Sequence, residues 1–190
     1  MLRSENAGKY AEKKVMDLGA GMGIVGITLA KLIGCKVTMT DYIPEVLALC
    51  KENIDMNDFK ADCKPACLHL DWNNYQDCSI VKKGEKFDVI IGCELVYAVT
   101  RSQNLVKLIQ EILAPGGTLV MIIPTTRENR EEFLGLMRQL GEFEIFESEL
   151  VGESYRRSPL ARSTEEEPTP DVFYPLKSVD FRYLEIKFNK

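Results

Sequence analysis

The sequence predicts an α/β fold in which seven strands form one mostly parallel sheet, with helices on both faces and an antiparallel hairpin at the C-terminal end. Three observations carry this prediction. Short apolar strand patterns alternate with helix patterns through most of the chain, which is typical of a parallel sheet covered on both sides. A glycine-rich loop joins the first strand to the first helix. Near the C-terminus, two segments alternate apolar and polar residues with no convincing helix between them, as antiparallel strands do.

Five short apolar runs predict the parallel strands, and the best of them are rich in β-branched residues. They cover residues 14–18, 36–40, 65–70, 87–92 and 118–123. The run Phe87-Asp-Val-Ile-Ile-Gly92 has the strongest pattern, and the run at 65–70 has the weakest.

Four segments between and after these runs predict helices, at residues 23–33, 44–56, 103–113 and 127–140. The first is apolar on most faces, as expected of a helix packed on a sheet. Pro44 suits the first turn of the second helix. Pro115-Gly116-Gly117 closes the third helix, and the fourth has a charged outer face.

The C-terminal segments 143–151 and 179–188 predict the hairpin strands, joined by a long loop at 152–178. Long loops are usually functional or without fixed structure, and both interpretations remain open here. The loop has a basic half with three arginines and an acidic half with three glutamates, which could contact a charged protein surface. We expect one domain over residues 1–190, with 1–13 as an N-terminal remnant.

Composition excludes several classes of protein. The net charge of −5 over 190 residues argues against a broad nucleic-acid-binding surface, which needs clustered Lys and Arg. No apolar run approaches the length of a membrane helix, so no membrane association is expected. The first residues lack the apolar core of a signal peptide. We therefore expect a cytoplasmic protein, with the nucleus as a second location.

The six cysteines are scattered along the chain, which favours reduced, mostly buried thiols. Only Cys63-x-x-x-Cys67-x-His69 has a spacing that suggests a metal site, and no second ligand cluster completes it. His69 is the only histidine, which argues against a metal site built from several histidines and against a Ser-His-Asp triad. No metal is expected.

The loop Gly19-Ala20-Gly21-Met22-Gly23 predicts a site for a nucleotide-like cofactor. Glycine lets the backbone approach a ligand closely, and the following helix offers unpaired N–H groups at its start. Gly21, Gly23 and Gly26 also fit G-x-G-x-x-G, so the loop alone does not separate a dinucleotide from S-adenosylmethionine.

Polar residues follow the next three strands, where parallel sheets bind ligands. Asp41 could accept hydrogen bonds from both ribose hydroxyls, or it could be a turn residue or N-cap. Trp72 could pack on an adenine while Asp71 accepts from its amino group, or the indole could cap the core. Glu94-Leu-Val-Tyr97 could contact a ligand bound at this edge, or it could be a solvated strand end with a core tyrosine.

These motifs, in this order, resemble the seven-β-strand methyltransferases, whose sheet is Rossmann-like. Asp17-Leu-Gly-Ala-Gly-Met-Gly23 looks like the first motif of that family. Leu70-Asp71-Trp72, together with Glu94-x-x-Tyr97, is similar to one branch, the family-16 protein lysine methyltransferases, which carry Asp-x-x-Tyr at the latter position. The motifs cover residues 15–123, and the remainder matches only in strand pattern.

The resemblance implies methyl transfer from S-adenosylmethionine to a protein lysine, with S-adenosylhomocysteine as product, by a monomer. Glu94 would capture and orient the lysine, and Tyr97 would shape the transfer channel. The implied cofactor-binding residues are Asp17, Gly19, Ala20, Gly21, Gly23, Asp41, Tyr42, Asp71, Trp72 and Cys93. Enzymes that methylate amino groups of nucleic acids typically carry Asn-Pro-Pro-Tyr where this chain has Cys93-Glu-Leu-Val96, which argues against a nucleic-acid substrate.

One departure keeps alternatives open. Family-16 enzymes usually have a longer N-terminal segment with a tryptophan that helps to close the cofactor pocket, whereas only 16 residues precede Asp17 and none is Trp. The chain could be truncated, the pocket could be more open, or activity could be lost. The alternatives are a small-molecule methyltransferase, a non-catalytic methyltransferase-like binding protein and, with the least support, an NAD-dependent oxidoreductase, for which no Tyr-x-x-x-Lys pair is evident.

Overall fold

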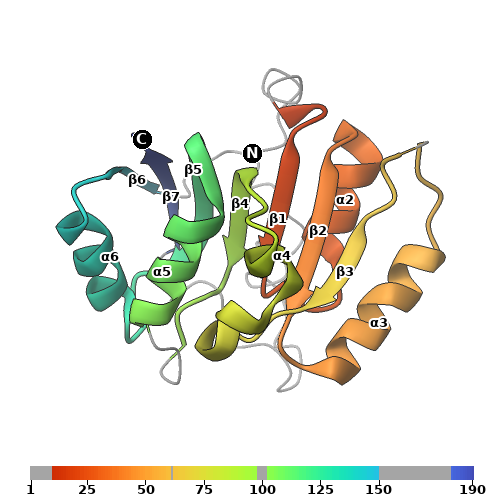
Figure 1. The fold of residues 1–190 in the computed structure, drawn as a ribbon, viewed down its shortest axis with the longest axis horizontal. Coiled ribbons are helices and arrows are strands. Elements are labelled where there is room, and N and C mark those ends of the chain that lie inside the picture. The colour runs from red at the N-terminus through yellow and green to blue at the C-terminus, as the bar shows by residue number, and fades with distance from the viewer. Residues whose placement is uncertain (1–9, 61, 98–101, 150–180) are drawn as a thin grey trace, which may run out of the picture.

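In the part of the chain that the structure describes, seven strands form one sheet in the order β3-β2-β1-β4-β5-β7-β6 (Figure 1). The computed structural model describes residues 10–60, 62–97, 102–149 and 181–190. Strands β1 to β5 pair in parallel, whereas β7 pairs antiparallel with both β5 and β6. The predicted Rossmann-like fold class is therefore confirmed, including its antiparallel end.

The observed strands lie close to the predicted ones. They are β1 (Lys14–Leu18), β2 (Lys36–Asp41), β3 (Ala66–His69), β4 (Phe87–Cys93), β5 (Leu113–Pro124), β6 (Phe143–Glu149) and β7 (Phe181–Phe188). The prediction placed the start of β5 five residues too late. Leu113 already pairs with Phe87, and the register then shifts around Pro115, which has no N–H to donate, and Gly116, whose φ is 72°.

The described helices are α2 (Ile24–Ile33), α3 (Pro44–Asp55), the 3-10 helix η1 (Trp72–Asp77), α4 (Ser79–Lys82), α5 (Ser102–Ile112) and α6 (Arg130–Gln139). The sequence did not predict η1 or α4. It also started α6 three residues too early, because a turn precedes the helix, in which the Arg130 N–H donates to the Arg127 carbonyl at 3.1 Å.

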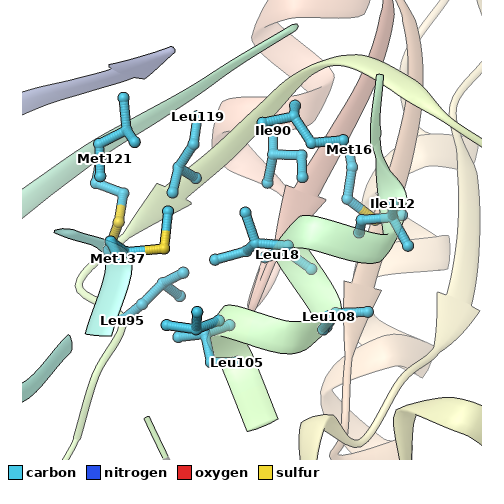
Figure 2. Packing of buried hydrophobic residues seen from close by; sticks show 14 of the residues in the cluster. Met16, Leu18, Ile90, Leu95, Leu105, Leu108, Ile112, Leu119, Met121 and Met137 are labelled. Carbon is cyan, nitrogen blue, oxygen red and sulfur yellow. The ribbon is translucent and has the colours of Figure 1, made fainter. Parts of the chain in front are cut away.

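Each face of the sheet carries its own apolar cluster. One cluster packs α4, α5 and α6 against side chains such as Met16, Ile90 and Met121 (Figure 2). The other packs α2 and α3 against the opposite face, where Val15 and Val89 point. Because side chains alternate along a strand, β1 and β4 supply both clusters and the sheet joins them.

The sheet order reverses beside β1, which pairs with β2 on one side and β4 on the other. The register sets Leu18 opposite Gly92, and Asp41 opposite His69, so the carboxyl ends of these strands share one edge. Open α/β sheets bind their ligands at this edge, next to such a reversal. The fold therefore fixes where a site is to be sought.

The N-terminal remnant and the hairpin loop of the predicted domain organisation fall largely or wholly outside the described residues. This holds for 1–9 of the N-terminal remnant and for the whole loop at 152–178. Tyr10 is described and buried, and its carbonyl accepts a hydrogen bond from Cys35 Sγ at 3.0 Å. Within the described ranges, none of the helices has the length and apolar character needed to cross a membrane.

Candidate functional site

A cavity of about 610 Å³ opens at the carboxyl ends of β1 to β4. Its lining comes from the last residue of β2 and from the loops and first helical turns that follow these strands. The lining residues are Gly19, Gly21, Asp41, Tyr42, Ile43, Val46, Asp71, Trp72, Asn73, Leu95 and Tyr97. The cavity is therefore built from the segments in which the sequence analysis placed the cofactor and the acceptor.

The glycine loop follows β1 with a left-handed backbone at Gly19, Gly21 and Gly23, where φ is 61°, 56° and 88°. A Cβ on Gly19 would lie 3.0 Å from Leu95 Cδ2 and 3.4 Å from Trp72 Cζ2. A Cβ on Gly21 would meet no atom within 4 Å. Glycine at position 19 thus lets three segments meet, and glycine at 21 leaves space next to the backbone.

Asp41 connects two of the loops that line the cavity. Its Oδ2 accepts from the Gly21 N–H at 3.1 Å, and its Oδ1 accepts from the Ile43 N–H at 3.1 Å. The turn-residue alternative is therefore realised. It does not exclude a ribose contact, because each carboxylate oxygen can accept a second hydrogen bond and Asp41 also lines the cavity.

Asp71 and Trp72 also have two kinds of contact. Asp71 is the N-cap of η1, and its two oxygens accept from the Asn73 N–H at 2.8 Å and from Asn74 Nδ2 at 2.9 Å. The Trp72 side chain packs against the apolar cluster and lines the cavity as well. The proposed adenine contact and the core-capping alternative are thus compatible with each other.

Asp17 lies at the end of β1 but is not among the lining residues of the cavity. Its side chain is 2% exposed, and Oδ2 has no hydrogen-bond partner. Burial raises the pKa of this carboxyl to about 7, and the backbone amide of Gly26 opposes that shift by a smaller amount. Such a group is costly to ionise in place.

Glu94 and Tyr97 follow β4, where the backbone is left-handed at Glu94 and Val96, with φ of 60° and 68°. The Glu94 carboxylate forms an ion pair with Arg127, a residue that the sequence analysis did not select. The Arg127 guanidinium carbon also lies 4.8 Å from the centre of the Tyr97 ring, within reach of a cation–π contact. Partial burial raises the pKa of the Tyr97 phenol, which stays protonated at neutral pH.

The cavity brings together seven of the predicted site residues: Gly19, Gly21, Asp41, Tyr42, Asp71, Trp72 and Tyr97. The other five, Asp17, Ala20, Gly23, Cys93 and Glu94, are not among its lining residues. The Ala20 N–H donates to Thr40 O, and the Gly23 N–H donates to Ala20 O, both at 2.9 Å, so these two shape the loop. The functional roles of all twelve stay predictions.

The sequence analysis missed Ile43, Val46, Asn73 and Leu95 in the lining, and Arg127 beside it. One signal could have found Arg127: it closely follows the fifth predicted strand, at the edge where Glu94 follows the fourth. The described residues contain no group of three or more His, Cys, Asp or Glu side chains that could hold a metal ion. The lone histidine instead lies with Nε2 3.0 Å from the Tyr42 carbonyl.

Comparison with known structures extends the fold assignment. The chain is similar to a TehB-like SAM-dependent methyltransferase from Corynebacterium glutamicum, with a TM-score of 0.63, 17% identity, and coverage of 95% of this chain and 82% of that one. It is also similar to a methyltransferase from Pyrococcus furiosus, with a TM-score of 0.58, 18% identity, and coverage of 94% and 76%. At these identities the likeness concerns the fold alone.

Curated relatives have higher identity. The chain is 29% identical over 136 residues to protein-lysine N-methyltransferase EFM3 of Chaetomium thermophilum, covering 68% of this chain and 40% of that protein. It is 34% identical over 131 residues to protein N-lysine methyltransferase METTL21A of Danio rerio, covering 67% and 56%. It is 33% identical over 106 residues to EEF1A lysine methyltransferase 3 of Xenopus tropicalis, covering 56% and 44%. The chain spans about half the length of these relatives.

A family model described as "Lysine methyltransferase" matches residues 1–140, which is well over half of the chain. This range contains the glycine loop, Asp41, Trp72, and the Glu94 and Tyr97 pair. The family predicted from these motifs is therefore confirmed, and the protein belongs to the lysine methyltransferase family.

Proposed function

We propose that this protein is an S-adenosylmethionine-dependent protein-lysine N-methyltransferase. The observation that carries the proposal is that one cavity at the sheet reversal is lined both by the glycine loop, Asp41 and Trp72 and by Tyr97. Residues suited to a nucleoside and a residue suited to an acceptor amine thus share one space. Membership of the lysine methyltransferase family supports this assignment.

The residues of the cavity suit the proposed cofactor. Asp41 would accept hydrogen bonds from the ribose hydroxyls, Trp72 would pack on the adenine, and Asp71 would accept from the adenine amino group. When bound, the cofactor would supply a sulfonium methyl group for transfer to the lysine nitrogen, with S-adenosylhomocysteine as the product. The protein contributes position and the exclusion of water.

The acceptor must lose a proton before it can react. Lysine has a reference pKa near 10.4, so only about one amine in a thousand is neutral at pH 7.4. Glu94 captures and orients the lysine, and Tyr97 shapes the channel through which it reaches the cofactor. Because a relative is named for EEF1A, we propose EEF1A as the first substrate to test.

Two measurements test the proposal. Calorimetric titration with S-adenosylhomocysteine should show micromolar binding, and NADH should show none. Incubation with labelled S-adenosylmethionine and EEF1A should then label lysine. Binding of NADH alone would contradict the cofactor assignment. Labelling of small molecules only would favour the small-molecule methyltransferase, and cofactor binding with no transfer would favour the non-catalytic protein.

Variants of the acceptor residues make the assignment specific. We expect Glu94→Gln and Tyr97→Phe to lower the methyl-transfer rate at least about a hundredfold, because orientation of the reacting groups is lost. Their affinity for S-adenosylhomocysteine should stay within about threefold of wild type, which is under 1 kcal/mol. Glu128→Gln is the matched control, since Glu128 is exposed on the loop after β5. Full activity in both acceptor variants would show that other residues hold the lysine.

A further inference from the structure

Arg127 is the charged residue beside the cavity that the proposed mechanism has not used. It lies in the turn after β5, where its N–H donates to the Pro124 carbonyl at 3.1 Å. Strands β4 and β5 pair in parallel, with Cys93 opposite Ile122, so the loops after both strands leave the sheet at the same edge. This is why Arg127 and Glu94 meet although they are far apart in the sequence.

The Arg127 side chain is only 20% exposed, and that of Glu94 is 35% exposed. The Arg127 guanidinium pairs with the Glu94 carboxylate and lies over the Tyr97 ring. A carboxylate and an aromatic face are also what Glu94 and Tyr97 would offer to the ammonium group of a lysine. The two residues assigned to the acceptor are therefore already in contact with a cation from the protein itself.

The charge of Glu94 matters for the proposed reaction. A lone carboxylate next to a lysine ammonium favours the charged form of the amine, whereas only the neutral amine carries the lone pair that forms the new bond. The positive charge of a guanidinium on the same carboxylate offsets part of its field at the amine, and so favours the neutral amine more than a lone carboxylate does. The carboxylate can still accept a hydrogen bond.

We propose that Arg127 is a positioning residue that holds Glu94 and the Tyr97 ring in place and compensates the Glu94 charge, so that the bound lysine gives up its proton to solvent more readily. This inference rests on the proposed lysine methyltransferase activity. It assigns a role to a residue outside the Glu-x-x-Tyr motif.

The test compares Arg127→Gln and Arg127→Lys with Arg138→Gln, the same charge change at an exposed position of α6. Steady-state kinetics are measured from pH 6.5 to 10 on the full chain with EEF1A. For Arg127→Gln we expect kcat at pH 7.5 to fall about tenfold and the acidic limb of the pH profile to move up by about one unit, because each unit changes the neutral fraction tenfold. Activity then returns at high pH.

KM should stay the same or fall in Arg127→Gln, because an uncompensated Glu94 attracts the lysine cation more strongly. Arg127→Lys should recover part of kcat, since lysine restores the positive charge but lacks the planar guanidinium that can donate two hydrogen bonds to one carboxylate. Arg138→Gln should behave as wild type. A loss of kcat by the same factor at every pH would mean a structural role only. A fall in KM with kcat unchanged would mean that Arg127 merely occupies the lysine position.

A second measurement needs no turnover. A double-mutant cycle in urea unfolding, with Glu94→Gln and Arg127→Gln, measures the coupling of the pair. Additive effects would overturn the inference whatever the activity of the wild type. If the cycle showed coupling but the wild-type protein transferred no methyl group, the proposed function would be overturned. The role of Arg127 in that reaction would be overturned with it.

Discussion

Asp17 is a buried carboxyl residue next to the glycine loop, and its ionisation affects the stability of the fold. Its carboxyl is buried at the end of β1 with an unpartnered oxygen, and burial raises its pKa from 3.8 to about 7. The folded protein therefore binds this proton more tightly than the unfolded chain does. Between these two pH values, stability falls as the pH rises, and above about pH 7 the full cost of a buried charge remains.

Asp17→Asn tests this cost. We expect the variant to be more stable than wild type at pH 8, by a few kcal/mol, because the amide cannot ionise. The difference should shrink as the pH falls from about 7 toward 4, where the wild-type carboxyl is protonated in the folded state. Urea unfolding at pH 5, 6.5 and 8 measures it, with the exposed Asp77→Asn as control. A difference that does not depend on pH would show that ionisation is not its cause.

The residues of the site were predictable where the sequence immediately around them indicates a ligand contact. Asp41 ends β2 and Trp72 follows β3, at the edge where such sheets bind ligands. A glycine loop before a helix is typical of a site for a nucleotide-like ligand. For Asp41 and Trp72 the sequence left a functional and a structural interpretation open, and the structure realises the structural one while leaving both residues on the cavity. Arg127 was not selected, because its importance depends on a partner from the loop after the neighbouring strand, although its place after the fifth predicted strand put it at the same sheet edge as Glu94.

At the scale of elements, predictability followed periodicity. Strands β1, β2 and β4 were predicted to within one residue, because their apolar runs are too short for a helix and are bounded by glycine or charged residues. The 3-10 helix η1 was missed because its sequence, Trp72-Asn-Asn-Tyr-Gln-Asp77, is polar, and its start depends on the Asp71 cap. The extra residues of β5 depend on pairing with β4, which no local pattern records.

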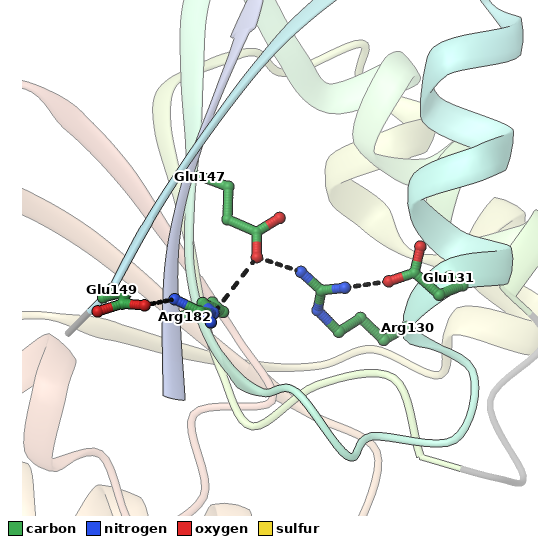
Figure 3. A network of polar contacts seen from close by, with 5 residues as sticks. All are labelled: Arg130, Glu131, Glu147, Glu149 and Arg182. Carbon is green, nitrogen blue, oxygen red and sulfur yellow. Dashed lines mark hydrogen bonds and ion pairs between the residues drawn. The ribbon is translucent and has the colours of Figure 1, made fainter. Parts of the chain in front are cut away.

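Helix α6 is joined to the antiparallel end of the sheet by a network of charged side chains (Figure 3). Arg130 lies between Glu131 and Glu147, with Nη2 2.5 Å from Glu147 Oε1. Glu147 Oε1 is also 3.6 Å from Arg182 Nε, and Arg182 Nη1 is 2.9 Å from Glu149. Since the Arg130 side chain is only 9% exposed, Glu147 compensates a nearly buried charge.

Removal of that compensation should destabilise the packing of α6 on the sheet. We expect Glu147→Gln to lower the free energy of unfolding by about 1–3 kcal/mol, because a buried guanidinium loses a charged partner. Glu149→Gln, at a side chain that is 65% exposed, should change it by less than about 0.5 kcal/mol. Urea unfolding curves compare the two. Equal effects would mean that the network contributes nothing beyond ordinary surface pairs.

For the whole molecule, the sheet makes the two apolar clusters interdependent. Along β4, Ile90 points into one cluster while Val89 and Ile91 point into the other, and Leu119 and Val120 divide in the same way along β5. Neither cluster can be lost without exposing strands that the other uses. We therefore expect one cooperative transition, in which the cavity does not unfold separately from the sheet.

Trp72 allows this expectation to be measured, because it is the only tryptophan and it lines the cavity. Its fluorescence and the far-UV circular dichroism should give coincident urea transitions. S-adenosylhomocysteine at a hundred times its Kd should raise the free energy of unfolding by about 2.7 kcal/mol in both signals, because a ligand that binds only the folded state stabilises all of it. In Asp41→Ala, where the loops that line the cavity lose their shared acceptor, the shift should vanish while the two signals still coincide. If the fluorescence transition alone moved with ligand, the cavity would be a separately unfolding region, and the sheet would not connect the site to the rest of the molecule.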